Sequence, residues 1–425
     1  MILTEFEPTL IFARALDRQD RLADFRKKFV IEDPDLIYLD GNSLGRLPIQ
    51  TASVINEIIR YQWGQQLVRS WGESWMKAPL RIGDKLACLV GARPGEVIVA
   101  DSVSTNLYKL IMAGLAIRPG RLRIISDTLN FPTDLYILQG CIQLLGGRHQ
   151  IELLPTKDSI TVDIAEVIKA IDQNTALITL SQVAFKSSFL YSVPMITQKA
   201  HESGALVLWD LSHSAGVIPI QLDQWQVDMA VGCTYKYING GPGAPAFLYV
   251  NEKLQAELIS PIWGWFGDRS PFAFNPEYQP ADGIARFQAG TPPIISLLAI
   301  ETGVDTLLEA GIDRIREKSI NQTSYLIYLF DQFLSPIGFT LGTPRDAQKR
   351  GSHVSIRHPD GYQINQALNN EMKLIPDFRE PDNIRLGVAP LYTRYEDLWW
   401  AVDRIRRVVV ETVYLKYSKE RGAVT

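Results

Sequence analysis

Lys236 occupies an unusual place for a lysine. It lies between two tyrosines in the segment CTYKYINGGPGAP, after an apolar run at 228–232 that predicts a buried strand and before a glycine-rich turn. Lysine is unfavourable to bury and is most often a solvated surface residue. A surface lysine beside a turn would account for the residue, and so would an amine that does covalent chemistry. The surrounding segments bear on this choice.

Three other segments place polar or aromatic side chains directly after an apolar run. Asp210 ends LVLWD and is followed by His213 in LSHSAG. The polar turn SVSTNL, with Val103 and Ser104, follows EVIVAD, and Phe131 follows RIISD in TLNFPTD. Taken singly, each segment is also explained by helix capping, core packing or a local hydrogen bond.

Together the four segments meet the requirements of one ligand, pyridoxal 5′-phosphate. A helix start with hydroxyls and free backbone N–H groups suits a phosphate, and an aromatic face such as Phe131 suits a flat heteroaromatic ring. An aspartate such as Asp210 keeps the ring nitrogen protonated, and a lysine such as Lys236 forms a Schiff base with the aldehyde. Asp210 and Lys236 are separated by about the number of residues that connects one strand to the next, which could bring the two strand ends side by side.

This interpretation sets electrostatic conditions for both residues. Lys236 has to be partly desolvated, so that its amine is unprotonated and nucleophilic near neutral pH. A positive pyridinium nearby pushes the lysine in the same direction. Asp210 has to stay ionised, because it holds the proton that makes the cofactor ring an electron sink.

The elements that position these residues alternate between apolar strands and helices. We expect strands at 121–127, 151–155, 175–183, 205–210, 227–237 and 243–251, with helices at 133–147, 161–173 and 193–204. The strands are continuous apolar runs, as in a parallel sheet covered on both faces. We therefore predict an α/β fold with a mostly parallel sheet, whose ligands gather at the carboxyl ends of the strands.

The remaining segments predict a division into three parts. Residues 1–50 contain a helix and a substrate-side loop, GNSLGRLP, that we expect to pack with a smaller domain. Residues 51–295 would form the large cofactor-binding domain, beginning with a helix from Thr51 to about Arg69. From about Ser296 the pattern turns to long helices and a short α+β segment, which predicts a small C-terminal domain over 296–425.

Composition excludes several classes of protein. The net charge of −4 and the pI near 5.8 argue against nucleic-acid binding, and no apolar stretch is long enough to span a bilayer. Cys88, Cys141 and Cys233 fit neither a disulfide framework nor a zinc site. With no signal peptide, they predict a reducing cytoplasm. Five histidines without a paired pattern predict no catalytic metal.

With these residues in place, the chain resembles the kynureninases, pyridoxal-phosphate enzymes of the fold type I (class V-like) aminotransferase superfamily. The resemblance covers roughly Tyr38 to Tyr392. It is carried by YLDGNSLGRLP, RIGDKLACLVGARPGEVIVADSVSTNLYKL, NFPTD, DLSHSAG, TYKY, GWFG, GTPPI and IRLGVAPLY. The D-x-x-H and Y-K motifs indicate only the superfamily, whereas GNSLG, FPTD, GWFG and TPP together are more particular to kynureninases.

The resemblance implies a set of cofactor-binding residues. They are Val103, Ser104, Phe131, Asp134, Ser181, Asp210, His213, Tyr235, Lys236, Trp265 and Thr291. Lys236, Tyr235 and Asp210 would be catalytic, with Lys236 and Tyr235 transferring protons. Trp265 and Thr291 would reach the phosphate from the neighbouring subunit, which implies a homodimer with its active sites at the interface.

The resemblance also implies the substrate and its contacts. Arg385 would bind the α-carboxylate bidentately, Trp71 would line the aryl pocket, and Asn42 and Ser43 would contact the substrate. The implied reaction is the hydrolysis of L-kynurenine to anthranilate and L-alanine, or of 3-hydroxy-L-kynurenine to 3-hydroxyanthranilate. Tryptophan catabolism or NAD biosynthesis would be its setting.

One segment departs from the family pattern and keeps alternatives open. After Ser181, where family members tend to carry a tyrosine and a Thr-Gly pair, this chain has QVAFKSSFLYS. The stretch borders the cofactor and substrate side, so a different aryl substrate is one alternative. Another fold type I enzyme, such as a class V aminotransferase or a cysteine desulfurase, is a second. An inactive scaffold would predict the loss of Lys236, Asp210 or Arg385, and all three are present.

Overall fold

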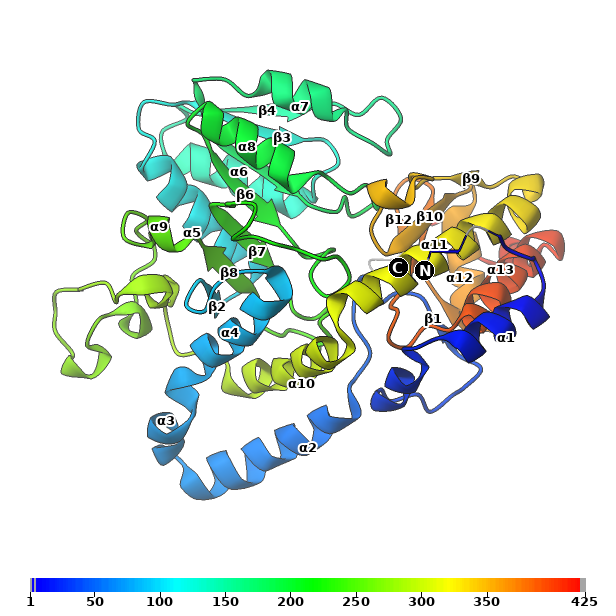
Figure 1. The fold of residues 1–425 in the computed structure, drawn as a ribbon, viewed down its shortest axis with the longest axis horizontal. Helices are drawn as coiled ribbons and strands as arrows, with labels where there is room; N and C mark the ends of the chain where they lie inside the picture. Colours follow the sequence, from blue (N-terminus) through cyan, green and yellow to red (C-terminus); the bar gives the residue numbers. More distant parts are fainter. Residues whose placement is uncertain (1, 4, 421–425) are drawn as a thin grey trace.

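A seven-stranded sheet forms the centre of the computed structural model, which describes residues 2–3 and 5–420 (Figure 1). Its strand order is β2-β8-β7-β6-β5-β3-β4. The strands are β2 (Val97–Val99), β3 (Arg123–Asp127), β4 (Gln150–Leu154), β5 (Thr175–Ser181), β6 (Leu206–Asp210), β7 (Met229–Gly232) and β8 (Phe247–Val250). The pairs from β4 through β7 are parallel, and β8 runs antiparallel to β7 and β2. The predicted mostly parallel α/β sheet is confirmed.

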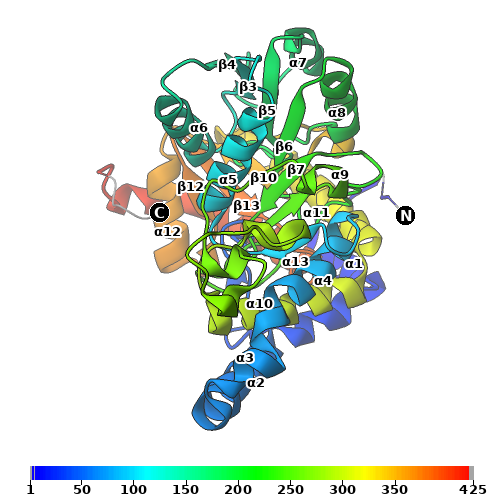
Figure 2. The ribbon, with the colours of Figure 1, turned by 90° about the vertical axis from the view of Figure 1, so that its left-hand side faces the viewer.

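Helices cover both faces of this sheet, which explains the continuous apolar strands. In β6, Leu206 and Leu208 pack in a core with α5 (Val103–Ala116) and α6 (Pro132–Leu144). The residues between them, Val207 and Trp209, pack in a second core on the opposite face. That core includes α4 (Ala78–Val90), α7 (Ile164–Ala170), α8 (Val193–Glu202) and α10 (Ile294–Ala310). Figure 2 shows α6 and α8 on opposite sides of the strands.

A separate antiparallel sheet forms the C-terminal part, in the order β12-β13-β10-β9. Its strands are β9 (Thr340–Leu341), β10 (His353–Arg357), β12 (Asp377–Arg379) and β13 (Asn383–Gly387). The helices around it are α11 (Ile312–Phe333), α12 (Gly361–Glu371) and α13 (Tyr395–Val410). A parallel pair, β1 (Ile37–Tyr38) and β11 (Leu374–Ile375), ties the N-terminal segment to this part.

The N-terminal helix α1 (Leu10–Gln19) packs with the C-terminal elements. Its buried residues Ala13 and Leu16 belong to the same apolar core as α11, α12 and α13. The chain then forms a 3₁₀ helix, η1 (Ala23–Lys28), after a turn in which Asp20 Oδ1 accepts a hydrogen bond from the Leu22 N–H at 2.9 Å. This packing agrees with the expected association of residues 1–50 with the C-terminal part, whereas α10, beyond residue 295, packs against the large sheet. The division near residues 50 and 295 stays a prediction.

Residues 49–73 project from the body as an arm, visible in both views (Figures 1 and 2). The arm consists of α2 (Ile49–Glu57), a π-helical stretch η2 (Ile58–Gln66) and α3 (Arg69–Glu73). The helix predicted from Thr51 to about Arg69 therefore begins at Ile49 and changes its winding after Glu57. In the described part of the chain, no helix combines the length and apolarity that crossing a bilayer requires.

The remaining helical elements are short. They are α9 (Glu252–Gln255) and the 3₁₀ helices η3 (Trp75–Lys77), η4 (Trp265–Gly267), η5 (Pro271–Ala273), η6 (Gly283–Phe287), η7 (Ser335–Ile337), η8 (Ala347–Lys349) and η9 (Val413–Lys416). Four of them, α9, η4, η5 and η6, lie in the long connection between β8 and α10.

The loop that carries Lys236 is held by α10. The strand predicted at 227–237 ends at Gly232, where both its neighbours stop pairing with it, so Lys236 lies on a loop. Gly303 of α10 packs directly on this loop: a β-carbon added at Gly303 would overlap the carbonyl oxygen of Ile238. The missing side chain therefore sets the distance between the helix and the loop.

We predict that Gly303→Ala lowers the free energy of unfolding by about 1–3 kcal/mol, because the added methyl group overpacks this contact. Gly140→Ala is the matched control, since Gly140 also lies within a helix, α6, and its added β-carbon would meet no atom within 4 Å. That variant should gain about 0.5–1 kcal/mol from helix propensity. Denaturant-induced unfolding measures both, and equal effects of the two substitutions would contradict the packing argument.

Candidate active site

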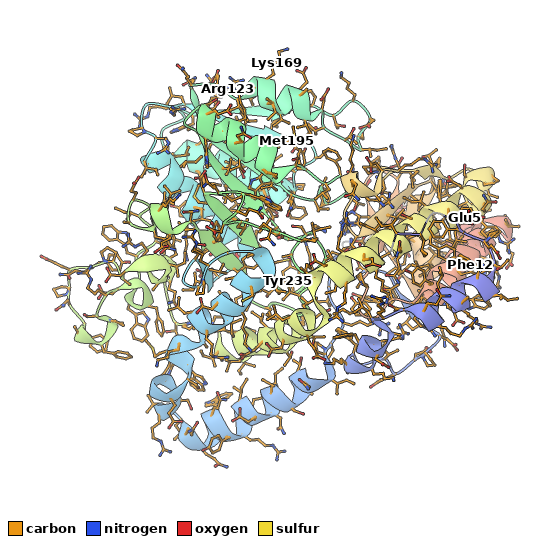
Figure 3. All side chains as sticks on the ribbon, in the orientation of Figure 1. Glu5, Phe12, Arg123, Lys169, Met195 and Tyr235 are labelled. Atoms are coloured by element: carbon orange, nitrogen blue, oxygen red, sulfur yellow. The ribbon has the colours of Figure 1, made fainter. Side chains whose placement is uncertain are left out.

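A cavity of about 740 Å³ lies at the carboxyl ends of the central strands. The N-terminal loop, the large sheet and the C-terminal sheet all contribute to its wall. The predicted site residues that line it are Asn42, Ser43, Val103, Ser104, Phe131, Asp134, Asp210, His213, Tyr235, Lys236, Thr291 and Arg385. In the view of Figure 3, Tyr235 lies between the large sheet and α10 with α11.

The pairing of β6 with β7 brings Lys236 beside the end of β6. Asp210 is the last residue of β6 and pairs with Val231 of β7, the strand that leads into the Lys236 loop. The loop backbone is held by two hydrogen bonds: Gly45 N–H donates to the Tyr235 carbonyl at 2.8 Å, and Asn239 N–H donates to the Lys236 carbonyl at 2.9 Å. The half-buried Lys236 side chain faces the cavity.

His213 is the hydrogen-bonding partner of the Lys236 amine. The distance from Lys236 Nζ to His213 Nε2 is 3.0 Å. Burial, and then the charge of Lys236, lowers the pKa of His213 well below its usual range. A neutral imidazole can therefore accept a hydrogen bond from the amine through Nε2. Its buried Nδ1 has no partner among the described residues.

Two buried carboxyl groups, Asp134 and Asp210, face the cavity from neighbouring elements. Asp210 Oδ1 accepts a hydrogen bond from the Ser212 N–H at 2.7 Å. Asp134 lies in the first turn of α6, and its buried Oδ2 has no partner in the described chain. Burial raises the pKa of both groups, and the charge of Asp210 raises that of Asp134 further. A cationic ring N–H would satisfy the free oxygen and favour ionised carboxylates, so this pair fits a pyridinium nitrogen.

The first turn of α5 offers a site for a phosphate at the other end of the cavity. Ser102 is the N-cap and accepts a hydrogen bond from the Thr105 N–H at 3.3 Å, so the hydroxyl does cap the helix. The preceding N–H groups, of Val103 and Ser104, point past the helix end, where backbone N–H groups and the helix dipole favour anions. Capping and anion binding are therefore compatible here.

Phe131 presents an aromatic face rather than filling the core. It is the N-cap residue of α6, and its side chain is 40% exposed. Its ring meets the ring of Phe185 edge to face, with the centroids 5.2 Å apart. A bound flat ring would cover the exposed face of Phe131.

Arg385 is held rigidly at the opposite wall. Its guanidinium forms a bidentate ion pair with Asp377, with Nε 2.7 Å from Oδ1 and Nη2 close to Oδ2. Nη2 also donates to Ser43 Oγ at 3.0 Å, and Nη1 donates to the Phe185 carbonyl at 2.6 Å. Burial opposes ionisation of Asp377, but the Arg385 and Arg379 charges outweigh it and lower the pKa of that carboxyl.

A third carboxyl group, Asp40, adjoins this ion pair. Burial, and then the charge of Asp377, raises the pKa of Asp40 to about 7. The Ser43 hydroxyl and the charges of Arg385 and Arg379 act in the opposite direction. The charge of Asp40 therefore changes near neutral pH.

Ser181, Trp71 and Trp265 do not line the cavity. Ser181 ends β5 beside Asp210, but its hydroxyl donates to Asn130 Oδ1 at 2.7 Å, which places it behind the wall. Trp71 packs against Phe266, with ring centroids 5.5 Å apart, and the neighbouring Trp265 is exposed. Thr291, which the resemblance assigns to the neighbouring subunit, lies at the cavity of its own chain. The roles of all these residues stay predictions.

Sequence reasoning missed the lining residues Phe185 and Arg379. It also missed Asp377, which pairs with both arginines. Phe185 belongs to the segment QVAFKSSFLYS, so the interpretation that this departure borders the site is correct. Arg379 and Asp377 gave no signal, because only the pairing of β12 with β13 sets them beside Arg385. Among residues 2–3 and 5–420, no cluster of three or more potential metal ligands is present.

The fold and the cavity define a pyridoxal-phosphate-dependent enzyme of fold type I. A cysteine desulfurase from Thermococcus onnurineus NA1 superposes with a TM-score of 0.78 at 18% identity, covering 91% of this chain and 98% of that one. The cysteine desulfurase CsdA from Escherichia coli gives 0.76 at 16% identity, covering 96% and 100%. At these identities the likeness shows the fold alone.

Sequence relatives decide the family within this class. The chain is 42% identical over 400 residues to a kynureninase from Pseudomonas fluorescens, which covers 93% of this chain and 94% of that protein. It is also 42% identical over 402 residues to a kynureninase from Burkholderia pseudomallei (strain 1106a), with the same coverage. The kynureninase C-terminal domain family matches residues 315–405. The chain belongs to the kynureninase family, and is thus a pyridoxal-phosphate-dependent hydrolase of a carbon–carbon bond.

The raised pKa of Asp40 predicts a pH-dependent stability. Between its usual pKa of 3.8 and about 7, the folded state keeps a proton that the unfolded state has lost. Stability should therefore fall as pH rises through this window. Asp40→Asn removes the loss, so its melting temperature should rise relative to wild type from pH 5 to pH 8. Asp33→Asn is the control, because the pKa of Asp33 is lowered and its carboxyl is ionised throughout. Parallel pH profiles for wild type and Asp40→Asn would refute this.

Proposed function

We propose that this chain hydrolyses L-kynurenine to anthranilate and L-alanine, with 3-hydroxy-L-kynurenine as the alternative substrate of the same site. Lys236 is the residue that forms the Schiff base with the cofactor aldehyde. The observation that carries this proposal is the position of its amine: it faces the cavity, 3.0 Å from a buried histidine, beside Asp210. Family membership supplies the class of reaction, and this geometry supports the assignment of the lysine.

Each end of the cavity suits one part of the cofactor. The first turn of α5 would bind the phosphate, and the exposed face of Phe131 would stack on the ring. Asp134 and Asp210 would hold the ring N–H, which restores a charge partner to both buried carboxyls. When bound, pyridoxal phosphate withdraws electrons from the substrate α-carbon, which weakens the bonds to that carbon.

The protein's own groups then move protons, and the water that the hydrolysis consumes adds to the ketone carbon beside the aryl ring, which becomes the carboxyl carbon of anthranilate. Lys236 would carry the proton at the α-carbon, and the neutral His213 keeps the amine oriented without adding a second positive charge. Burial raises the pKa of Tyr235, so its hydroxyl stays protonated at neutral pH and can donate a proton to the substrate β-carbon when the bond from that carbon to the carbonyl carbon breaks. Placement of this kind accelerates a reaction by roughly 10²–10⁴-fold.

We predict that Lys236→Ala abolishes both the visible absorbance band of the lysine-bound cofactor and the release of fluorescent anthranilate from L-kynurenine. Lys85→Ala is the matched control, because Lys85 is also partly buried, in α4, but lies outside the cavity. Both substrates are assayed in parallel to decide the preference at the ring 3-position. An unchanged band in Lys236→Ala would refute the lysine assignment. A normal band in wild type, without release of anthranilate from L-kynurenine or of 3-hydroxyanthranilate from 3-hydroxy-L-kynurenine, would refute the reaction.

We further propose a homodimer whose active sites include residues of both subunits. The arm and the connection between β8 and α10 carry a set of exposed aromatic side chains, which soluble monomers rarely gather. They are Tyr61, Trp63, Trp263, Trp265, Phe272 and Phe274. Trp265, which the resemblance assigns to the partner's cofactor site, is among them and lies outside the cavity of its own chain. A second subunit would cover these rings and bring Trp265 to its neighbour's site.

The dimer predicts complementation between two inactive variants. Lys236→Ala and Trp265→Ala homodimers should each be inactive or nearly so. After unfolding and refolding of an equal mixture, heterodimers of a two-fold symmetric enzyme hold one intact site each, so about a quarter of the wild-type activity should return. Sedimentation velocity checks the dimer itself. A monomer, or a mixture as inactive as its parts, would contradict a shared site.

We also propose that the protein works in the reducing cytoplasm. Cys88, Cys141 and Cys233 are all free in the structure, and two of them are buried. None of the three lines the cavity, which also argues against the desulfurase alternative.

A further inference from the structure

The end of the cavity assigned to the substrate carboxylate contains two arginines and not one. Arg379 lines the cavity together with Arg385. The two lie close together because β12 pairs antiparallel with β13, with Asp377 directly opposite Arg385. Arg379 follows Asp377 by two residues, so both side chains extend from the same face of β12. Asp377 therefore lies between two guanidinium groups.

Arg385 by itself offers little charge to a ligand. Its side chain is 2% exposed, and the bidentate pair with Asp377 neutralises it. Two further N–H groups reach Ser43 Oγ at 3.0 Å and the Phe185 carbonyl at 2.6 Å, which leaves one N–H, on Nη1, for a ligand. A buried ion pair without net charge attracts another anion only weakly, although one free N–H can still donate to it. Arg385 is thus well placed to orient a carboxylate, but its pair with Asp377 lacks the net positive charge that would attract one.

Arg379 carries the charge that this pair lacks. Its side chain is 31% exposed, against 2% for Arg385. It shares Asp377 Oδ2 with Arg385, through an ion pair of 2.8 Å, and Nη1 donates to the Phe378 carbonyl at 2.8 Å. With one carboxylate between two guanidiniums, the cluster keeps one positive charge while the adjoining Asp40 is protonated, and this charge matches the single negative charge of an α-carboxylate.

We propose that Arg379 is a second substrate-binding residue, which supplies the net positive charge for the α-carboxylate while Arg385, fixed by Asp377, orients it. The proposal rests on the proposed function, because it takes the cavity to bind an α-amino acid. It gives Asp377 a positioning role, because this carboxylate holds both arginines and neutralises only one of their two charges.

The test compares ligands that differ only in the carboxylate. L-Alanine, the proposed product, and ethylamine share the amine, and only L-alanine carries the group that Arg379 would bind. Dissociation constants are measured on the holoenzyme from the change in cofactor absorbance and by calorimetry. In Arg379→Gln, the constant for L-alanine should rise by about 10- to 100-fold, the size expected for a charged hydrogen-bonded contact. The constant for ethylamine should not change.

Two further variants separate ligand binding from damage to the fold. Arg379→Lys keeps the charge, so it should recover most of the lost affinity for L-alanine. Arg357→Gln is the matched control: Arg357 lies in the same sheet, is 28% exposed and pairs with Asp382, but does not line the cavity. It should leave both ligands unaffected. Steady-state kinetics with L-kynurenine should show a raised KM in Arg379→Gln, with a smaller change in kcat.

Three outcomes would overturn the proposal. One is an unchanged constant for L-alanine in Arg379→Gln; another is an equal rise for L-alanine and ethylamine, which indicates a general disturbance. The third is Arg379→Lys binding as weakly as Arg379→Gln while both melt like wild type. These results are distinct from failure of the proposed function, in which wild type binds L-alanine selectively over ethylamine but releases no anthranilate.

Discussion

The parallel pairing of β5, β6 and β7 is the constraint on which the site depends. Backbone hydrogen bonds between these strands bring their carboxyl ends to one level, so Asp210 ends beside the strand that leads to Lys236. Both faces of the strands are buried under helices, which leaves this edge as the place where polar side chains can face a cavity. A shift of β6 by one residue would turn Asp210 to the opposite face of the sheet.

Charges in the cavity are distributed to match a ligand that is itself polar along its length. Helix α5 presents N–H groups at one end, the carboxyls of Asp134 and Asp210 lie deep in the cavity, and the Arg385–Asp377–Arg379 cluster lies at the opposite wall. Burial makes the isolated groups unfavourable, which is visible in the raised pKa values of both aspartates. A ligand with a phosphate, a cationic ring nitrogen and a carboxylate would compensate each of them in turn.

The site also requires that three parts of the chain meet. Gly45 of the N-terminal loop donates to the Tyr235 carbonyl, and Ser43 of the same loop accepts from Arg385. The Phe185 carbonyl, from the loop after β5, accepts from Arg385 as well. The arginine on the C-terminal sheet is therefore fixed by residues from both other parts. Binding of a substrate carboxylate there would therefore depend on the correct placement of all three parts.

The sequence alone determined the α/β sheet and most of the strand ends that line the cavity. Each of these strand ends is a local pattern, in which an apolar run is followed by a polar residue or a helix cap. One run ends in Asp210 and another precedes Lys236. A parallel sheet brings such strand ends together wherever it forms. The motifs around these strand ends also indicated the family, because a motif can be recognised from the sequence without knowledge of the contacts that its residues make. The departure at QVAFKSSFLYS was visible for the same reason, and Phe185 within it does line the cavity.

Tertiary structure alone decided the rest. That Phe131 is exposed rather than core depends on what packs above it, and Ser181 hydrogen-bonds behind the wall because Asn130 reaches it there. Asp377 and Arg379 lie in a short strand with an ordinary composition, and their importance comes from the register of β12 against β13. Net charge at a site is a sum over groups from distant segments. It exists only after the chain has folded, and no local pattern of residues encodes it.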